Sequence, residues 1–375
     1  MRPFTGEFNL TKLERVVSGA GSIDSLGEEL DRRSLARAIV VTGKTLGASM
    51  LLQRLTKALG PRCALVFTGA RQHVPATTVR EIVNEAERAE ADCLISFGGG
   101  SPIDTTKAAL HALLQPGVDR VIHIAVPTTL SGGEYSAVAG VTDESNRVKS
   151  GVADPRIAAR TVVNDPHLTV ETPDWLWAAT GMRALDHAIE SAYSVRHHPV
   201  STALATGAMA SLVEHLPPSL QRDDPGWLDH RAHCQLAAWP AIFGMQNAGF
   251  GLSHAFGHQI GPKWDVPHGV TSCIMLPHAM RFMAEIAPER FGPIAEGFGL
   301  PFDRAHARTS AVACADRTAD FIARLKLPMR LRDVNVPEQG IDDVADIVHG
   351  AMERARVVDR PVTRDEIRGV VHQAY

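Results

Sequence analysis

The sequence is poor in cysteine, and this shortage excludes two classes of protein. It has five cysteines in 375 residues, an odd number without any C-x-x-C pair. Scattered single cysteines argue against both a disulfide framework and a thiolate metal site, and they favour a reducing compartment such as the cytoplasm. The five are Cys63, Cys93, Cys234, Cys273 and Cys314.

The sequence also lacks a long hydrophobic run and a strong excess of charge. No run of 18 apolar residues is present, and the stretch Met1–Glu7 lacks the apolar core of a signal peptide. A net charge of -4 leaves no basic footprint for nucleic acid and no polybasic membrane patch. We therefore expect a cytoplasmic protein whose partners are small molecules, with no nucleic acid or membrane partner.

What is present is an ordinary globular composition, 45% hydrophobic and 21% charged, without repeats. A chain of 375 residues is long for one core and suits two domains. The strand-rich pattern stops near Asp165–Pro173. We predict a first domain over residues 1–168 and a second over 169–375.

The first half alternates short Val- and Ile-rich runs with helix-like segments. Strands are predicted at Arg37–Thr42, Ala64–Thr68, Asp92–Phe97, Val121–Val126, Val138–Val141 and Thr161–Val163, and helices at Ala48–Leu59, Thr77–Ala91 and Pro102–Leu114. A polar loop is expected over Thr142–Ser150. This alternation predicts an α/β domain, a doubly wound and mainly parallel sheet with helices on both faces.

The second half carries helix-compatible periodicity almost throughout, so we predict an all-α domain. The expected helices are Trp175–Val195, Val200–His215, Gly226–Gln246, Leu252–Gln259, Thr271–Ala287, Asp303–Leu325 and Ile341–Arg354.

A glycine-rich turn follows the third strand of the first half. Glycines let the backbone approach a phosphate, and a capped helix after them supplies free N–H groups and a positive dipole. Ser101 is the predicted cap, with Pro102 in the first turn. The stretch matches neither G-x-G-x-x-G nor G-x-x-x-x-G-K-[ST], and a tight turn without a ligand is the alternative. The predicted pyrophosphate cradle comprises Gly98, Gly99, Gly100, Ser101 and Asp104.

Polar residues also follow two other strands, at the edge where ligands of doubly wound folds bind. Thr128, Thr129 and Ser131 come after one strand, and Gly43 and Lys44 after another. We predict that they contact the cofactor.

Lys149, in the polar loop, is a further candidate, and it points either to the ligand cleft or to solvent.

Three histidines in the second half have a spacing that brings them together. His254 and His258 are four residues apart and share a helix face, and a stretch rich in glycine and proline returns the chain to His268. Arg183 and His187 share another face by the same rule. Many histidines on helices are ordinary core or surface residues, and the chain has 17 histidines, so the alternative that these residues form no site stays open.

With these elements in hand, the chain resembles the iron-containing alcohol dehydrogenase family, which includes the maleylacetate reductases. The residues that carry the resemblance are Gly98–Lys107, Pro127–Thr129, Gly181–Glu190, His254–His258, Pro267–Gly269 and Leu276–His278. The resemblance implies a dinucleotide domain followed by a helical domain, with hydride transfer between NAD(P) and a carbonyl-type substrate in a cleft between them. It also implies a homodimer.

In metal-dependent members of the family, an Asp, a His four residues later and two further histidines hold Fe²⁺ or Zn²⁺. By this resemblance the histidine ligands would be His187, His254 and His268, and His258 would lie beside the nicotinamide. Arg183 stands where those members have the Asp. A cation ~4 Å from a divalent ion costs about 8 kcal/mol at an effective dielectric constant of 20, which makes a metal doubtful.

Maleylacetate reductases resemble this chain in lacking the Asp and in working without a metal. Arginine suits a carboxylate, so we predict that Arg183 binds a substrate carboxylate. His187, His254 or His268 would stabilise the developing enolate or alkoxide, and His258 would relay the proton. The alternative is a metal-dependent alcohol or aldehyde dehydrogenase, with Arg183 drawn aside by Asp186 and a metal on the three histidines.

Two other classes stay open, a lyase or cyclase like the related dehydroquinate synthases and a catalytically idle binding protein. The preferred dinucleotide is open as well. Gly43 stands where NAD-preferring relatives carry an Asp, and Lys44 is adjacent, so NADP(H) is tolerated unless Gly43 serves only the turn.

Overall fold

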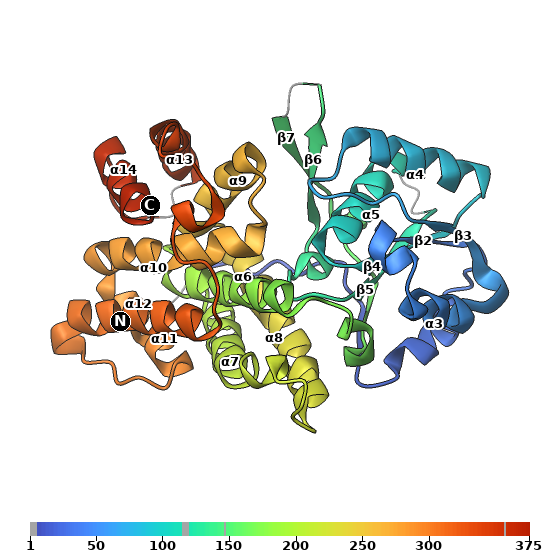
Figure 1. Ribbon diagram of the computed structural model, residues 1–375, viewed down its shortest axis with the longest axis horizontal. Helices are drawn as coiled ribbons and strands as arrows, with labels where there is room; N and C mark the ends of the chain where they lie inside the picture. The colour runs from blue at the N-terminus through green and yellow to red at the C-terminus, as the bar shows by residue number, and fades with distance from the viewer. Residues whose placement is uncertain (1–5, 115–119, 146–147, 356–357) are drawn as a thin grey trace. The chain divides into compact units, whose positions relative to one another are not determined.

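The structure is a computed structural model that describes residues 6–114, 120–145, 148–355 and 358–375 (Figure 1). It divides into two compact units, Leu10–Thr172 and a second one made of Pro173–Tyr375 with the residues up to Asn9. Asn9 N–H donates to Asn247 Oδ1 at 2.5 Å, which ties the early residues to the second unit. The predicted boundary after residue 168 stays a prediction.

The first unit is built on a six-stranded sheet in the order β1-β8-β5-β4-β2-β3, and every neighbouring pair is parallel. The strands are β1 (Arg15–Ser18), β2 (Ala38–Val41), β3 (Cys63–Phe67), β4 (Cys93–Gly98), β5 (Ile122–Pro127) and β8 (Thr161–Asn164). Because β2 and β4 are buried on both faces, they read as continuous apolar runs rather than alternating ones. The α/β prediction is confirmed.

Helices cover both faces of this sheet. Successive strand residues point to opposite faces of the sheet, so Val40 and Val41 belong to two separate apolar clusters, one on each face. Helices α1 (Leu26–Arg32) and α3 (Met50–Leu59) pack into one cluster, and α4 (Ala76–Arg88) and α5 (Gly100–Leu113) into the other. A short helix, α2 (Lys44–Gly47), follows β2.

One prediction about strands in this unit was wrong, and one strand was not predicted. The stretch Thr142–Ser150 is not simply a polar loop, because β6 (Val138–Asp143) and β7 (Val148–Ala153) form an antiparallel hairpin that includes most of it. The edge strand β1 was not anticipated, because Val16 and Val17 are too short an apolar run to stand out from a loop.

The second unit is helical, as predicted. Its helices are α6 (Asp174–Tyr193), α7 (Pro199–His215), α8 (Trp227–Ala248), α9 (Leu252–Trp264), α10 (His268–Ile286), α11 (Gly292–Gly297), α12 (Ala307–Arg324), α13 (Ile341–Ala355) and α14 (Arg364–Gln373). Helix α9 continues through Pro262 and ends at Trp264, and the next residue, Asp265, has a left-handed φ of 55°, so the turn comes later than predicted. Of the helices described, none is long and apolar enough to cross a membrane.

Helix α6 is the centre of the helical unit. Every residue from Trp177 to Tyr193 is buried, and the helix packs against α7, α8 and α10. Gly181 permits the close approach to α7, because a Cβ there would lie 2.6 Å from Leu216 Cδ1. A helix enclosed on all sides holds its polar side chains at fixed positions.

Candidate active site

Helix α6 carries a buried polar stripe in its second half. Arg183, Asp186, His187 and Glu190 follow the i, i+3, i+4, i+7 spacing of one helix face, and all four are buried. Buried charges are tolerated only with partners. The neighbouring helices α9 and α10 supply these partners.

The carboxylate of Glu190 accepts hydrogen bonds from the backbone at the start of α9. It accepts hydrogen bonds from the backbone N–H groups of Gly251 at 2.9 Å and Ser253 at 2.7 Å. These belong to the N–H groups that a helix leaves without an internal partner at its first turn, where the helix dipole also favours an anion. A Cβ at Gly251 would lie 2.5 Å from Glu190 Oε1, so a larger residue there would displace this carboxylate from its hydrogen bonds.

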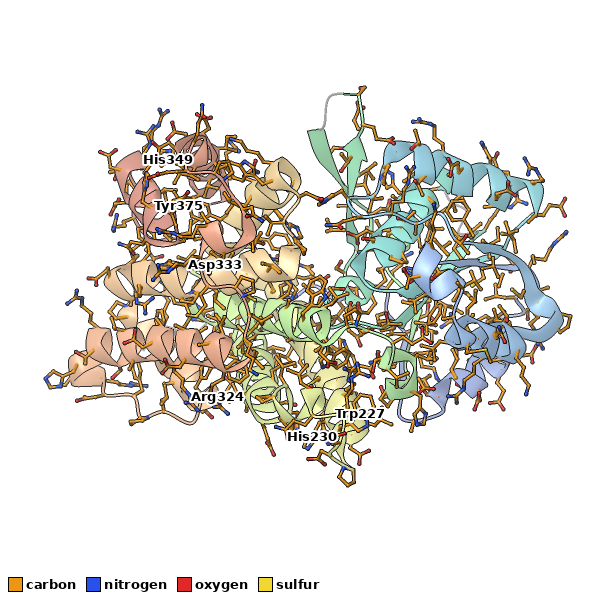
Figure 2. All side chains as sticks on the ribbon, in the orientation of Figure 1. Trp227, His230, Arg324, Asp333, His349 and Tyr375 are labelled. Carbon is orange, nitrogen blue, oxygen red and sulfur yellow. The ribbon has the colours of Figure 1, made fainter. Side chains whose placement is uncertain are left out.

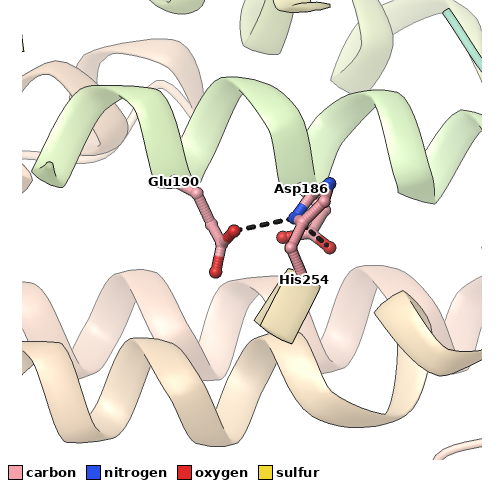
Figure 3. A group of neighbouring side chains, drawn as sticks. All are labelled: Asp186, Glu190 and His254. Atoms are coloured by element: carbon pink, nitrogen blue, oxygen red, sulfur yellow. Dashed lines mark hydrogen bonds and ion pairs between the residues drawn. The ribbon is translucent and has the colours of Figure 1, made fainter. Parts of the chain in front are cut away.

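The same carboxylate orients His254, the third residue of α9. His254 Nδ1 lies 2.7 Å from Glu190 Oε2 and 3.5 Å from Asp186 Oδ2, and Figure 3 draws the three side chains with these interactions as dashed lines. Ser253 Oγ donates to Asp186 Oδ2 at 2.9 Å. Within the described chain, the buried Nε2 of His254 has no hydrogen-bond partner.

The four predicted histidines form one continuous group. The ring centroids are 4.8 Å apart for His187 and His254, 6.4 Å for His254 and His258, and 5.2 Å for His258 and His268. Burial, then the charges of His254, Arg183 and His258, hold the pKa of His187 well below its usual value. The Nδ1 atom of His187 is buried and has no hydrogen-bond partner among the described residues.

Arg183 lies within this group as its one guanidinium. Its Nη1 donates to Ser272 Oγ of α10 at 3.1 Å and lies 3.8 Å from Asp186 Oδ2. Burial lowers the pKa of Arg183, and the carboxylates of Asp186 and Glu190 oppose that shift. Burial also disfavours ionisation of Asp186, but His254, Arg183 and Ser272 together hold the pKa of Asp186 below its usual value.

The predicted cradle lies where β4 and β5 end side by side. Gly98 pairs with Pro127 in the sheet register, and its φ of 140° is one that other residues rarely adopt. A Cβ at Gly99 would lie 2.9 Å from Thr129 Cγ2, and one at Gly100 would lie 3.6 Å from Ser131 Oγ. The backbone of Gly99 and Gly100 is therefore not covered by a side chain of its own where Thr129 and Ser131 approach it.

Hydroxyl groups around the cradle are buried without a protein partner in the described chain. They are Thr129 Oγ1 beside Gly99 and Ser131 Oγ beside Gly100. Such groups need a partner, and a bound ligand is one source. The candidate Thr128 donates its N–H to Gly98 O at 3.0 Å, which fixes the cradle from the β5 side.

The start of α5 differs from the prediction. The helix begins at Gly100 with Gly99 as its N-cap, so Ser101 is not the cap residue. The glycine takes the extended cap conformation itself, and the carbonyl of Ser101 instead accepts from Thr105 Oγ1 at 2.7 Å. Asp104, another candidate, pairs with buried Lys107 at 3.0 Å.

The remaining candidates lie elsewhere on the sheet. Gly43 is the N-cap of α2 and Lys44 its first residue, directly after β2. Lys149 stands opposite Thr142 in the β6–β7 hairpin, and its side chain lies outside the described residues.

The sequence reasoning missed several residues that shape the site. Ser272 was missed because no local spacing links it to Arg183. Glu190 could have been found, because it lies four residues after Asp186 in the stretch Gly181–Glu190. Phe250 was also missed, and its ring lies 5.2 Å from that of His254 and 5.6 Å from that of His258.

One group of side chains has the spacing of metal ligands. Asp186, Glu190 and His254, which Figure 3 draws as sticks, each offer an atom that lies within 4.8 Å of the others. Among the described residues this is the group with that geometry, and it shares only His254 with the set predicted from the resemblance.

Comparisons with known proteins match nearly the whole chain. Residues 14–166 match the family model described as iron-containing alcohol dehydrogenase, and residues 177–375 match the C-terminal model of the Fe-containing alcohol dehydrogenase family. The maleylacetate reductase of Burkholderia cepacia is 32% identical over 365 residues, 97% of this chain and 96% of the relative.

Two further relatives agree with this. Maleylacetate reductase 2 of Cupriavidus pinatubonensis is 34% identical over 288 residues, 76% of this chain and 77% of the relative. The crystal structure of maleylacetate reductase from Agrobacterium tumefaciens superposes with a TM-score of 0.85 at 28% identity, covering 100% of this chain and 99% of that one.

Proposed function

The chain belongs to the iron-containing alcohol dehydrogenase family and is an NAD(P)-dependent oxidoreductase, and from this premise we propose that it reduces a carboxylated, conjugated oxo-compound similar to maleylacetate. The observation that carries the proposal is the buried guanidinium of Arg183 among the histidines of the site. The names of the similar reductases point to the same substrate class.

Arg183 is placed to hold a substrate carboxylate. In the described chain it makes one hydrogen bond, from Nη1 to Ser272, and Asp186 at 3.8 Å lies beyond hydrogen-bond distance. A guanidinium has five N–H donors in a fixed fork that matches the two oxygens of a carboxylate. A substrate acid would therefore complete the set of partners that this buried cation needs.

The residues present do not fit a divalent metal ion. Both oxygens of Glu190 already accept backbone N–H groups, and His254 Nδ1 is occupied by the same carboxylate. The charge of Arg183 also acts on His187, since after burial and His254 it contributes to the lowered pKa of His187. We therefore propose a reaction without metal, whether the ligand set is the acidic group or the three histidines.

The α/β unit fits a dinucleotide. The glycines Gly98, Gly99 and Gly100 precede the free N–H groups of α5, and the hydroxyls of Thr129 and Ser131 lack protein partners in the described chain. A phosphate at a helix N-terminus and polar groups at strand ends would satisfy these atoms. We propose that these residues hold NAD(P)H, which supplies the hydride when bound.

The histidines would then handle the charge and the proton. Hydride addition creates negative charge on a substrate oxygen as an enolate or alkoxide, and a nearby donor stabilises it. Glu190 holds the Nδ1 side of His254, so the buried Nε2, which has no partner in the described chain, is the ring atom left to interact with this oxygen. His258, between His254 and His268, is placed to relay the proton.

The direct test is a substrate screen with the purified protein. Maleylacetate, simple aldehydes and simple alcohols are assayed with NADH and NADPH, and the metal content is recorded in parallel. We expect turnover of the carboxylated substrate that survives complete chelation. If chelation abolishes turnover and added Fe²⁺ or Zn²⁺ restores it, the protein is instead a metal-dependent dehydrogenase.

A further inference from the structure

A second group of histidines lies outside the candidate active site, where α7 ends and α8 begins. His215 is the last residue of α7, and His230 and His233 lie in the first turns of α8. His230 and His233 are three residues apart and so share a helix face. Figure 2 labels His230 beside Trp227 at this end of α8.

The ring of His215 contacts both of the others. The Nδ1 atoms of His215 and His230 are 2.9 Å apart, and the ring of His233 stacks on His215 with centroids 4.2 Å apart and planes 15° apart. A nitrogen pair at that distance shares one proton, donated by one ring and accepted by the lone pair of the other. In this arrangement one ring carries the proton on its Nδ1, and the lone pair on Nδ1 of the other ring points toward that proton.

We propose that His215, His230 and His233 form a binding site for a divalent ion of the late first transition row, Cu²⁺ or Ni²⁺. The ion replaces the proton shared by the two Nδ1 atoms, and the exposed His233 swings from its stack to become a third ligand. This site is separate from the residues assigned to the reductase reaction and does not depend on that assignment.

The separation of the two nitrogens selects the type of ion. With metal–nitrogen bonds of about 2.0–2.1 Å, nitrogens 2.9 Å apart subtend an angle of about 90° at the metal. That is the angle between neighbouring ligands in the square-planar or tetragonal geometry of Cu²⁺ and Ni²⁺, whereas tetrahedral Zn²⁺ needs a separation of about 3.3 Å. The broad χ2 torsion of histidine lets both rings aim their lone pairs at one point.

The surroundings favour His215 as a neutral ligand. Burial, then the neighbouring His233 and His230, lower the pKa of His215, and Glu214 partly opposes them. Metal binding requires the neutral imidazole. Glu214 Oε2 lies 4.0 Å from His215 Nε2, so a small movement of this exposed side chain would let it accept the second ring N–H, as carboxylates do behind many metal-bound histidines.

The test uses the full-length protein after removal of metals with a chelator. CuCl₂, NiCl₂, ZnCl₂ and MgCl₂ are titrated separately by calorimetry, and the melting temperature is measured with each. We expect one equivalent of Cu²⁺ or Ni²⁺ to bind, affinity in the order Cu²⁺, Ni²⁺, Zn²⁺, and no binding of Mg²⁺. Because the ion would join α7 to α8, it should also raise the melting temperature.

Variants locate the ion. His230→Ala and His215→Gln should each weaken Cu²⁺ binding by at least tenfold, and His233→Ala should weaken it less. The control His306→Ala removes an exposed histidine elsewhere, and His254→Ala removes one from the candidate active site. Both should keep the wild-type affinity.

The electron paramagnetic resonance spectrum of bound Cu²⁺ gives a second measurement, which does not depend on how the variants fold. We expect an axial signal with nitrogen coupling from at least two imidazoles. The proposal is overturned if His230→Ala and His215→Gln both bind Cu²⁺ like the wild type, or if binding is lost only in His254→Ala. Reductase activity in His230→Ala should be unchanged.

Discussion

Replacing Arg183 with methionine tests the central assignment. Methionine replaces the apolar stem of arginine with an unbranched apolar chain of similar flexibility, and it removes the charge and the donor fork. The change should leave the hydride reaction possible and remove the grip on a substrate carboxylate. Carboxylated and neutral substrates should therefore respond differently to the same substitution.

The structure sets the size of the effect. A hydrogen bond to a charged group contributes roughly 1.5–3 kcal/mol, so loss of the Arg183–carboxylate contact should lower kcat/KM by roughly 10- to 150-fold. A neutral aldehyde makes no such contact, so its kcat/KM should change less than about threefold. Asp186, 3.8 Å from Nη1, loses its cation in the variant, so a lower melting temperature is also expected.

The assay compares kcat/KM for a carboxylated oxo-compound and for an aldehyde of similar size, both measured by nicotinamide absorbance. Arg281→Met is the matched control, because Arg281 also lies on the helical unit but is only partly buried and pairs with the exposed Asp316. Double substitution of Arg183→Met with Asp186→Asn restores charge balance if the single variant folds poorly. Equal losses on both substrates would refute the carboxylate-binding role.

Three further predictions address other parts of the chain. Glu190→Gln removes the anionic acceptor at Nδ1 of His254, so kcat should fall roughly 10- to 100-fold with little change in dinucleotide affinity. The control Glu214→Gln should not lower kcat. Gly251→Ala should lower the melting temperature because its Cβ would lie 2.5 Å from a carboxylate oxygen, whereas Gly207→Ala, with open space in helix α7, should raise it. Burial raises the pKa of Glu134 from 4.5 to about 7, so the folded state keeps a proton that the unfolded chain releases, and stability should fall between pH 4.5 and about 7. In Glu134→Gln that slope should disappear, with on the order of 3 kcal/mol gained above pH 7 by denaturant unfolding; an unchanged slope would place the proton elsewhere.

The parts of the fold that the sequence predicted are those with a strong local pattern. The buried strands β2 and β4 appear as apolar runs, and the i, i+4 pair of His254 and His258 lies on one helix. Short or irregular elements were missed, such as β1, whose pairing with β8 joins residues far apart in the chain. Such pairing leaves no local signal.

The candidate site was predicted in its residues more than in its contacts. The four histidines and Arg183 were identified, but the bond between Glu190 and His254 depends on how α9 packs against α6. Their separation of 64 residues carries no pattern that a periodicity could detect. For the same reason, the contact between His215 and His230 appears only when α7 and α8 are packed together.

The enclosure of α6 limits how this enzyme can be altered. A catalytic loop can change its length or its direction. Helix α6, in contrast, is packed closely against its neighbours, so it can neither slide nor rotate without displacing side chains along its length. New chemistry on such a scaffold has to come from exchanging single side chains at fixed anchor points. If Arg183 binds the substrate carboxylate as proposed, a change of substrate should begin with Arg183 and its immediate contacts and leave the surrounding backbone unchanged.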